Sequence, residues 1–445
     1  MRPPESRPLT VRLLGGLVLW ISTLYCGPRT RAGKGRGREG SGLYPELAAL
    51  GFSEGSSPTL ASRVSRMTAL LPSFQTARDE LARDGVPLNN KVVRRIALRQ
   101  GFELLTTRKR DLERFRVGEL PCGTELHGKR VGVAIDGGRV RTRVVIRKKK
   151  DKRTGNKRRQ KFRTEWREPK LLIIFEMDER GRMVRRSRPW IDGTFQGPDE
   201  CLELVAMHLH RLGAVSAQRV AFLSDGAPWI WDRLDWVQNR VGLKEERVFK
   251  VLDWCHAVHH ISLALEALGL KGQERQQLYR QMRSCMKKGR VHRVTADLSL
   301  LAAKHPLDAK VWTEIRYLEK HAEAGHMEYG QLRKRGVALG SGAIESAVRR
   351  VVNLRLKGNG ILWEVENAEA MLVLRAAALT GRWDEALDHA RQTMARDRRV
   401  DWRWRSPDIP AELKLEALTS PPTSQPPAEQ AAASAAAYRG VFSWC

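Results

Sequence analysis

The chain is poor in cysteine and has no CxxC pair. The six cysteines are Cys26, Cys122, Cys201, Cys255, Cys285 and Cys445. Their scatter excludes a zinc ribbon and provides no disulfide framework, so a reducing, cytoplasmic compartment is expected. Acidic residues are also scarce, at 50 against 80 lysines and arginines, which leaves a formal charge of +30. This imbalance over 445 residues indicates a nucleic-acid partner, with a generally basic protein as the alternative.

A long apolar run is missing as well. The longest, LLGGLVLWISTLY at residues 13–25, is short for a membrane-spanning helix. Basic residues precede it, as in a signal peptide, but no small-x-small cleavage site is obvious. We therefore expect a buried β-hairpin that turns at Gly15 and Gly16, and no membrane partner.

The amino-terminal third divides into a basic arm and a helical region. Residues 1–42 hold the short apolar hairpin and end in the Gly/Arg stretch RTRAGKGRGREGSG. Residues 43–117 have a helical pattern, with starts at Ser57 and Ser73, each next to a proline, and a basic helix NKVVRRIALRQG after the turn DGVPLN. A helix, a short Gly turn and a basic second helix predict a helix-turn-helix that binds DNA, with a plain helical bundle as the alternative.

Residues 118–260 alternate strands with helices. The stretch VGVAIDGGRVRTRVVI at 131–146 is typical of a strand, a Gly-assisted bend and a second strand. KLLIIFEMD and RPWIDGTF follow as strands, and then come a helix at 199–212, the strand RVAFLSD, the helix PWIWDRLDWVQNR and the strand FKVLDWCHA. This order resembles an RNase H-like fold, an α/β fold with a mixed sheet and helices on both faces.

The rest of the chain is expected to complete that core. Residues 261–338 predict an all-helical insertion, because no strand pattern interrupts them. Residues 339–400 return to the core with its final helices, and residues 401–445 form a Pro/Ala-rich, low-complexity tail.

Three acids stand at comparable places in this order. Asp136 lies at the end of the first strand, Asp225 follows the fourth, and Glu345 lies one turn into the helix that Ser341 starts. In an RNase H-like sheet the acids of the site come from these three places. A carboxylate that ends an apolar strand is costly unless it binds a positive partner. We expect the three to hold two Mg²⁺ or Mn²⁺ ions roughly 4 Å apart for phosphodiester chemistry.

Each acid also has a simpler interpretation. Asp136 could belong only to an Asp-Gly turn, and Asp225 could be a strand end followed by a helix cap. Glu345 could pair with Arg349 on a helix surface. The metal-site prediction depends on all three acids occupying the expected steps of one topology.

A second motif, Asp253-Trp254-Cys255-His256, follows the fifth strand. Its D-x-x-H spacing predicts an imidazole, that of His256, beside the scissile phosphate as a proton donor or orienting group. A purely structural His256 is one alternative. A zinc site of neighbouring Cys and His residues is another, although adjacent ligands on one short helix cannot easily surround a tetrahedral ion.

Residues 139–170 contain sixteen lysines and arginines but only three acidic residues. So dense a basic run between two strands predicts a loop that contacts DNA phosphates, with a solvated hairpin tip as the alternative. The candidates are Arg139, Arg147, Lys148, Lys149, Lys150, Arg158 and Arg159.

Residues 41–383 resemble the DDE transposases of bacterial insertion sequences, specifically the ISKra-like type. The resemblance is carried by GKRVGVAIDGGRVR, FLSDGAPWIW, LDWCH and GSGAIESAVRRVVNLRLKGNGILW. It implies that Asp136, Asp225 and Glu345 are metal-binding catalytic acids and that His256 belongs to the active site. It also implies that basic and aromatic groups of the RLKGNGILW segment grip the transposon end. Those groups are Arg355, Lys357 and Trp363, and a core role for the tryptophan is the alternative.

The same resemblance implies a function. A protein of this kind cleaves and joins double-stranded DNA, both transposon ends and target, as a homo-oligomer on paired ends. It would act in the bacterial cytoplasm at the nucleoid. Two alternatives keep the fold: an RNase H-like nuclease without strand transfer, and a catalytically silent or domesticated DNA-binding descendant.

Overall fold

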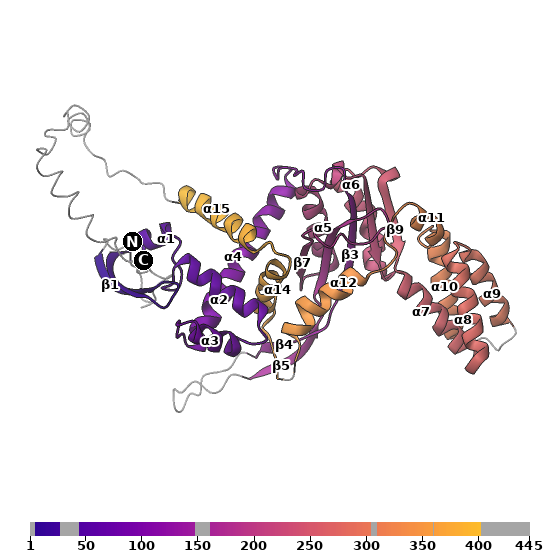
Figure 1. Ribbon diagram of the computed structural model, residues 1–445, viewed down its shortest axis with the longest axis horizontal. Helices are drawn as coiled ribbons and strands as arrows, with labels where there is room; N and C mark the ends of the chain where they lie inside the picture. Colours follow the sequence, from indigo (N-terminus) through magenta and orange to yellow (C-terminus); the bar gives the residue numbers. More distant parts are fainter. Residues whose placement is uncertain (1–4, 27–43, 147–160, 304–308, 359, 402–445) are drawn as a thin grey trace, which may run out of the picture. The chain divides into compact units, whose positions relative to one another are not determined.

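The computed structural model describes residues 5–26, 44–146, 161–303, 309–358 and 360–401 (Figure 1). The chain divides into two compact units, residues 1–395 and 396–445. The elements below belong to the first unit, except that its last helix, α15 (Trp383–Asp401), reaches beyond the boundary. The expected low-complexity tail lies outside the described residues from 402 onward.

A mixed five-stranded sheet forms the centre of the first unit. Its strands are β3 (Arg130–Gly137), β6 (Lys170–Met177), β7 (Trp190–Thr194), β8 (Arg219–Ser224) and β9 (Val248–Leu252). The spatial order is β7-β6-β3-β8-β9. β6 runs antiparallel to β3 and β7, whereas β8 runs parallel to β3 and β9. The α/β class is confirmed. Each expected strand of the sheet is present, but the one expected over FKVLDWCHA ends at Leu252, before the helix that begins at Trp254.

The two strands expected at residues 131–146 form, but they do not pair with each other as a hairpin. The second strand, β4 (Val140–Val145), pairs antiparallel with β5 (Phe162–Arg167) in a separate two-stranded sheet. β3 cannot accept it, because β6 and β8 already occupy both edges of β3. The chain therefore leaves the sheet after Gly137, where the Gly138 amide donates to the carbonyl of Pro169 at 2.9 Å.

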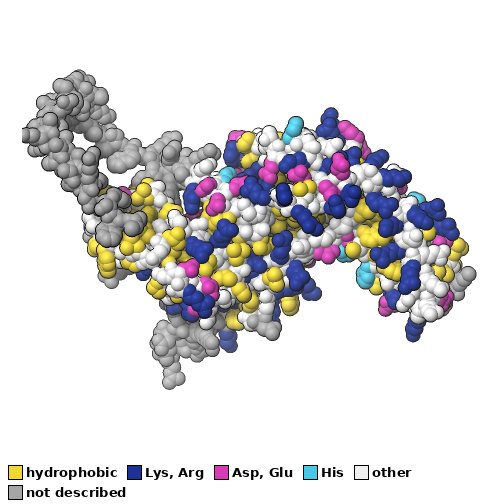
Figure 2. All heavy atoms as spheres, in the orientation of Figure 1, with side chains coloured by type: hydrophobic (Ala, Val, Ile, Leu, Met, Phe, Trp, Pro, Cys, Tyr) yellow, Lys and Arg dark blue, Asp and Glu magenta, His cyan; other side chains and the backbone are white. Residues whose placement is uncertain are grey.

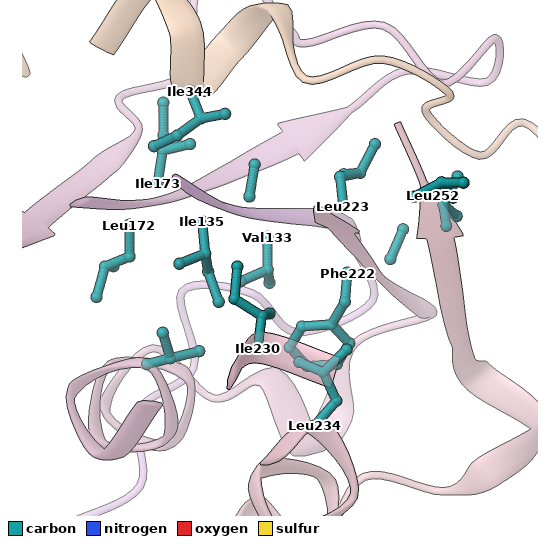
Figure 3. Packing of buried hydrophobic residues seen from close by; sticks show 14 of the residues in the cluster. Val133, Ile135, Leu172, Ile173, Phe222, Leu223, Ile230, Leu234, Leu252 and Ile344 are labelled. Carbon is teal, nitrogen blue, oxygen red and sulfur yellow. The ribbon is translucent and has the colours of Figure 1, made fainter. Parts of the chain in front are cut away.

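Helices cover both faces of the sheet, as predicted. They include α5 (Pro198–Arg211), α6 (Pro228–Val241) and α12 (Gly342–Ala347), with the short turns η1 (Ala214–Ser216) and η2 (Glu245–Arg247). Alternate strand residues point to opposite faces. Val133 points toward Ile230 of α6, and Ile173 points toward Ile344 of α12 (Figure 3). These apolar side chains are buried, which fixes the carboxyl ends of β3 and β8 between two helical layers.

The stretch after β9 is helical, as expected. Its elements are α7 (Trp254–Ala267), α8 (Gly272–Lys287), α9 (Val291–Ala303), α10 (Ala309–Glu323) and α11 (Tyr329–Lys334). No strand occurs among the described residues between 254 and 334, so we call these helices the helical insertion. Met282, Leu298 and Ile315 are buried between them.

The chain then re-enters the core with an irregular helix. α12 continues as a π-helical segment, η3 (Val348–Asn353), and ends in α13 (Leu354–Leu356). π-helical turns are rare and occur frequently at functional sites. The expected face of Ile344, Val348 and Val351 is buried against the core.

The amino-terminal helices are α1 (Pro45–Ala49), α2 (Pro58–Leu70), α3 (Phe74–Arg83) and α4 (Asn90–Arg116). Side chains of Ser57, Ser73 and Asn89 cap α2, α3 and α4 by accepting backbone N–H bonds. The basic helix continues well past Gly101 and packs on α14 (Val365–Leu379). A Cβ at Gly101 would lie 2.8 Å from the Ala370 carbonyl oxygen, so glycine permits this close helix crossing.

The predicted terminal hairpin is present, but it is not buried. β1 (Glu5–Arg12) and β2 (Val18–Tyr25) pair antiparallel, and Gly15 and Gly16 adopt positive φ in the turn. Trp20 is 80% exposed, and most side chains of β2 face solvent. A two-stranded sheet without a covering layer cannot bury both of its faces. In the described part of the chain, no helix is long and apolar enough to cross a bilayer.

Candidate active site

Two of the predicted acids meet at one edge of the central sheet. β3 and β8 are neighbouring parallel strands, so their carboxyl ends lie side by side. Asp136 is the penultimate residue of β3, and Asp225 directly follows β8. Both line a hollow of about 440 Å³, together with the predicted DNA-contact residues Arg139 and Lys357. Both of these basic side chains are exposed.

The surroundings of Asp136 disfavour the charged form of its carboxyl group. Burial raises the pKa of its carboxyl group to about 6, and the charges of Asp225 and Glu345 add to that rise. The Gly137 amide, which donates to Asp136 Oδ1 at 2.6 Å, and the imidazole of His256 act in the opposite direction. Asp225, Glu345 and His256 therefore lie close enough to Asp136 to influence its charge.

The Asp225 loop is held from two sides. Asp225 Oδ1 accepts the Ala227 amide at 3.0 Å at the start of α6. From the helical insertion, Tyr317 Oη donates to the Asp225 carbonyl oxygen at 2.7 Å. Gly226 has φ +84°, and a Cβ there would lie 2.3 Å from Tyr317 Oη. α10 of the insertion thus packs directly on the loop that carries Asp225.

Glu345 and the D-x-x-H motif form one chain of hydrogen bonds. His256 Nδ1 lies 2.7 Å from Asp253 Oδ2, and the Ser341 amide donates to Asp253 Oδ1 at 2.6 Å. Ser341 Oγ then donates to Glu345 Oε1 at 2.8 Å. Ser341 was expected to be an N-cap; it occupies that position, but its hydroxyl bonds the Glu345 carboxylate instead of a backbone amide. The buried Asp253 thus joins the start of α7 to the start of α12.

The surroundings of His256 suit a side chain that holds or passes a proton. The hydrogen bond to Asp253, the largest cause, raises the pKa of the imidazole although burial opposes it. Burial alone would raise the pKa of Asp253, but its bonds to His256 and to the Ser341 amide lower it, so the carboxylate is ionised. Nδ1 therefore carries the proton of this bond, and the imidazole side chain is 40% exposed.

The donor chemistry of the site suits a hard divalent cation. Asp136, Asp225 and Glu345 have no ion-pair partner in the described ranges, and mutual repulsion contributes to the raised pKa of Asp136. A bound cation would relieve that repulsion, and carboxylate oxygens are preferred ligands of Mg²⁺ and Mn²⁺. Among the described residues, no group of three or more His, Cys, Asp and Glu side chains is arranged so that it could hold a metal ion.

Two predicted DNA-contact residues lie in the interior. Arg355 is 2% exposed and Trp363 is 6% exposed. The Arg355 guanidinium packs over the rings of Phe74 and Trp363, and its Nε donates to the Thr68 carbonyl at 3.1 Å. Their burial contradicts the expected grip on a DNA end and supports the alternative of a core tryptophan. They join the amino-terminal helices to the segment beside β4.

The remaining basic candidates lie outside the described residues. These are Arg147, Lys148, Lys149, Lys150, Arg158 and Arg159. The strands that flank them present exposed aromatic side chains, with Phe162 46% and Trp166 57% exposed. Arg139 lies over the Trp166 ring at 5.7 Å. This combination of aromatic and basic groups was not predicted, because it requires the pairing of β4 with β5.

Sequence reasoning also missed Glu168 and Tyr317. The carboxylate of Glu168 lies against Gly137 and lines the hollow of Asp136 and Asp225. Tyr317 stacks on His260 with ring centroids 3.7 Å apart and reaches Asp225 from a helix distant in sequence. No local pattern marks either residue, because both roles come from tertiary contacts.

Comparisons with protein-family models, curated proteins and solved structures found no match. The fold and the site therefore define only an α/β protein with a carboxylate-lined hollow at one edge of a mixed sheet.

Proposed function

We propose that this protein is a metal-dependent enzyme that cuts phosphodiester bonds in DNA. More particularly, we propose a DDE transposase that cleaves the ends of an insertion sequence and joins them to target DNA. The observation that carries the proposal is the position of the acids. Asp136 and Asp225 end two adjacent parallel strands, and Glu345 follows the last strand of a sheet ordered β7-β6-β3-β8-β9. This order supports an RNase H-like core.

The acidic and the basic residues of the site have different parts in the proposed reaction. Asp136, Asp225 and Glu345 would hold the divalent ions, which activate the attacking oxygen and stabilise the leaving one. Arg139 and Lys357 line the same hollow and would compensate the charge of the phosphates around the scissile bond.

His256 and the helical insertion would set the geometry. Asp253 holds His256 through Nδ1, which leaves Nε2 to hold or pass a proton at the site. Ser341 fixes one oxygen of Glu345, and Tyr317 fixes the backbone at Asp225. The acids are thus oriented before any substrate arrives.

The test is Mg²⁺-dependent cleavage of a labelled duplex that spans the DNA terminus flanking the gene. We expect the wild type to cut, and Asp136→Asn, Asp225→Asn and Glu345→Gln to lose cleavage while they keep DNA binding. The matched control is Glu179→Gln, whose side chain is 91% exposed at the opposite end of the sheet and should leave cleavage intact. Cleavage retained by an acid variant would remove that residue from the site.

The products decide between the proposed transposase and its alternatives. Joined target DNA supports strand transfer, whereas cleavage without joining supports an RNase H-like nuclease. Binding of the terminus without cleavage by the wild type would support a silent or domesticated DNA-binding descendant. Pairing of two termini in one complex would support the homo-oligomer.

A further inference from the structure

The first two helices of the helical insertion lie antiparallel beside the candidate site. At one end, Arg275 Nη2 on α8 donates to the Ser262 carbonyl of α7 at 3.1 Å and to Ser262 Oγ at 2.9 Å. An α-helix advances about 1.5 Å per residue. Eight residues along α8 from Arg275 therefore bring Arg283 level with Cys255, seven residues back along α7 from Ser262. Arg283 thus lies beside the start of α7, next to the D-x-x-H motif.

The electrostatics of Cys255 agree with this register. Burial, followed by the charges of Asp253 and Glu345, raises the pKa of the Cys255 thiol, and Arg283 opposes the rise. Cys255 thus lies within electrostatic range of Glu345, one acid of the candidate site, and of Arg283 on α8.

α8 presents unpaired cations on one side. Arg280, Arg283 and Lys287 are spaced three and four residues apart, so they share one face of the helix. All three are exposed, and none has an ion-pair or hydrogen-bond partner in the parts of the chain described here. Met282 and Met286 point to another face and are buried in the insertion. The cationic face therefore does not serve the packing of the helix.

We propose that Arg280, Arg283 and Lys287 form a phosphate-binding track for the DNA that leaves the candidate active site. We call these three residues the α8 track; the inference rests on the proposed function and names where its substrate runs. Three unpaired cations in a row complement a phosphate backbone, and neutralised phosphates release counterions. Figure 2 shows further Lys and Arg side chains over the helical insertion.

A hollow lies next to the α8 track along the same two helices. Its volume is about 450 Å³, and its lining includes Ser262, Glu266, Arg275, Gln276 and Tyr279. The carboxylate of Glu266 pairs with Arg275 there at 3.1 Å, and Gln276 and Tyr279 add polar and aromatic contact surface beside that pair. The insertion therefore acts as an arm that holds DNA beside the candidate active site.

The test measures DNA binding separately from cleavage. The full-length protein is titrated with labelled duplex in EDTA at several salt concentrations, with the triple variant R280Q/R283Q/K287Q against the wild type. Each phosphate contact contributes about 0.9 to the slope of log affinity against log salt, so the variant should lower that slope by up to about 2.7. A duplex truncated at the cleavage position should remove the difference between wild type and variant.

The matched control is R180Q/R185Q/R186Q. These three exposed arginines lie in the loop after β6, and the antiparallel register of β3 and β6 puts that loop at the end of the sheet away from Asp136. We expect the control to keep the wild-type slope on both duplexes.

Two kinds of result overturn the α8 track. An unchanged slope in the α8 variant, or an equal drop in the control, would refute the track while leaving the proposed function standing. A wild type that binds no DNA refutes both. A wild type that binds through the α8 track but cuts no DNA refutes only the proposed enzyme.

Discussion

Arg108 ties three separate elements together in the interior, and its removal is the sharpest test of how the amino-terminal helices join the core. From α4, its Nη1 donates to Asp192 Oδ1 on β7 at 3.0 Å and to the Gly193 carbonyl at 2.8 Å. Its Nη2 donates to Glu369 Oε1 on α14 at 2.5 Å. The Arg108 side chain is 16% exposed, and both carboxylates are less exposed still.

Replacing Arg108 by methionine keeps the length of the apolar stem but leaves two carboxylates without their cation. Asp192 retains His208 Nε2 at 2.8 Å, and Glu369 retains the Thr194 hydroxyl at 2.8 Å. Breaking a buried ion pair by removing one partner costs about 3–5 kcal/mol. Against a total unfolding free energy of about 5–15 kcal/mol, this loss is large.

The same helix offers a matched control. Arg116 of α4 donates to both carboxylate oxygens of Glu203 at 2.6 Å, but its side chain is 51% exposed. An exposed ion pair contributes about 0–1 kcal/mol. Arg116→Met should therefore shift the urea midpoint only slightly, and Arg108→Met should shift it strongly. Both are followed by circular dichroism and by tryptophan fluorescence.

A double variant isolates the cause. Arg108→Met with Glu369→Gln should recover part of the lost stability, because one of the uncompensated charges is then gone. If Arg108→Met costs no more than Arg116→Met, the Arg108 cluster does not join the elements as described. If the double variant is less stable than Arg108→Met by the whole stability loss that Glu369→Gln causes alone, then Arg108→Met destabilises the protein through lost packing and not through an uncompensated charge.

Two further predictions concern pH and the Asp225 loop. Burial alone would raise the pKa of Asp192, but Arg108 and His208 lower it to about 2, while burial lowers the pKa of His208. For both groups the folded pKa lies below the unfolded one. Stability should therefore fall as the pH drops below 6.5, because His208 becomes protonated, and again from 3.8 toward 2, because Asp192 does. Acid titrations followed by circular dichroism measure this loss, and unchanged stability from pH 7 to 3 would contradict it. Tyr317→Phe removes one hydrogen bond to the Asp225 carbonyl, costs about 1 kcal/mol of stability, and should raise the Mg²⁺ concentration needed for half-maximal cleavage. A Mg²⁺ titration identical to that of the wild type would make Tyr317 a packing residue only.

The strands and helices of the core were predictable because each has a local cause. The apolar stretches around Ile135, Ile173 and Phe222 become strands whose side chains are buried. Ser57 and Ser73 cap α2 and α3, the two helices that they were expected to start. The positions of Asp136 and Asp225 followed from the same patterns, because each acid lies at the carboxyl end of an apolar strand.

The errors concern residues whose role depends on distant partners. β4 has the alternating pattern of a strand, but only the occupied edges of β3 decide that it pairs with β5. Arg355 and Trp363 have the composition of a DNA contact, yet they are buried against Phe74. Composition alone cannot distinguish a basic or aromatic side chain on the surface from one that packs between two elements.

The sequence by itself determined the α/β class, the order of the strands and helices, the basic character of the chain and the strand-end acids. These properties depend on hydrophobic period, turn residues and charge, which act over a few residues. Only the tertiary structure decided the hydrogen-bonded chain from His256 through Asp253 and Ser341 to Glu345, and the contact of Tyr317 with the Asp225 loop. Such contacts join elements far apart in the sequence, and they form only when the buried core brings those elements together.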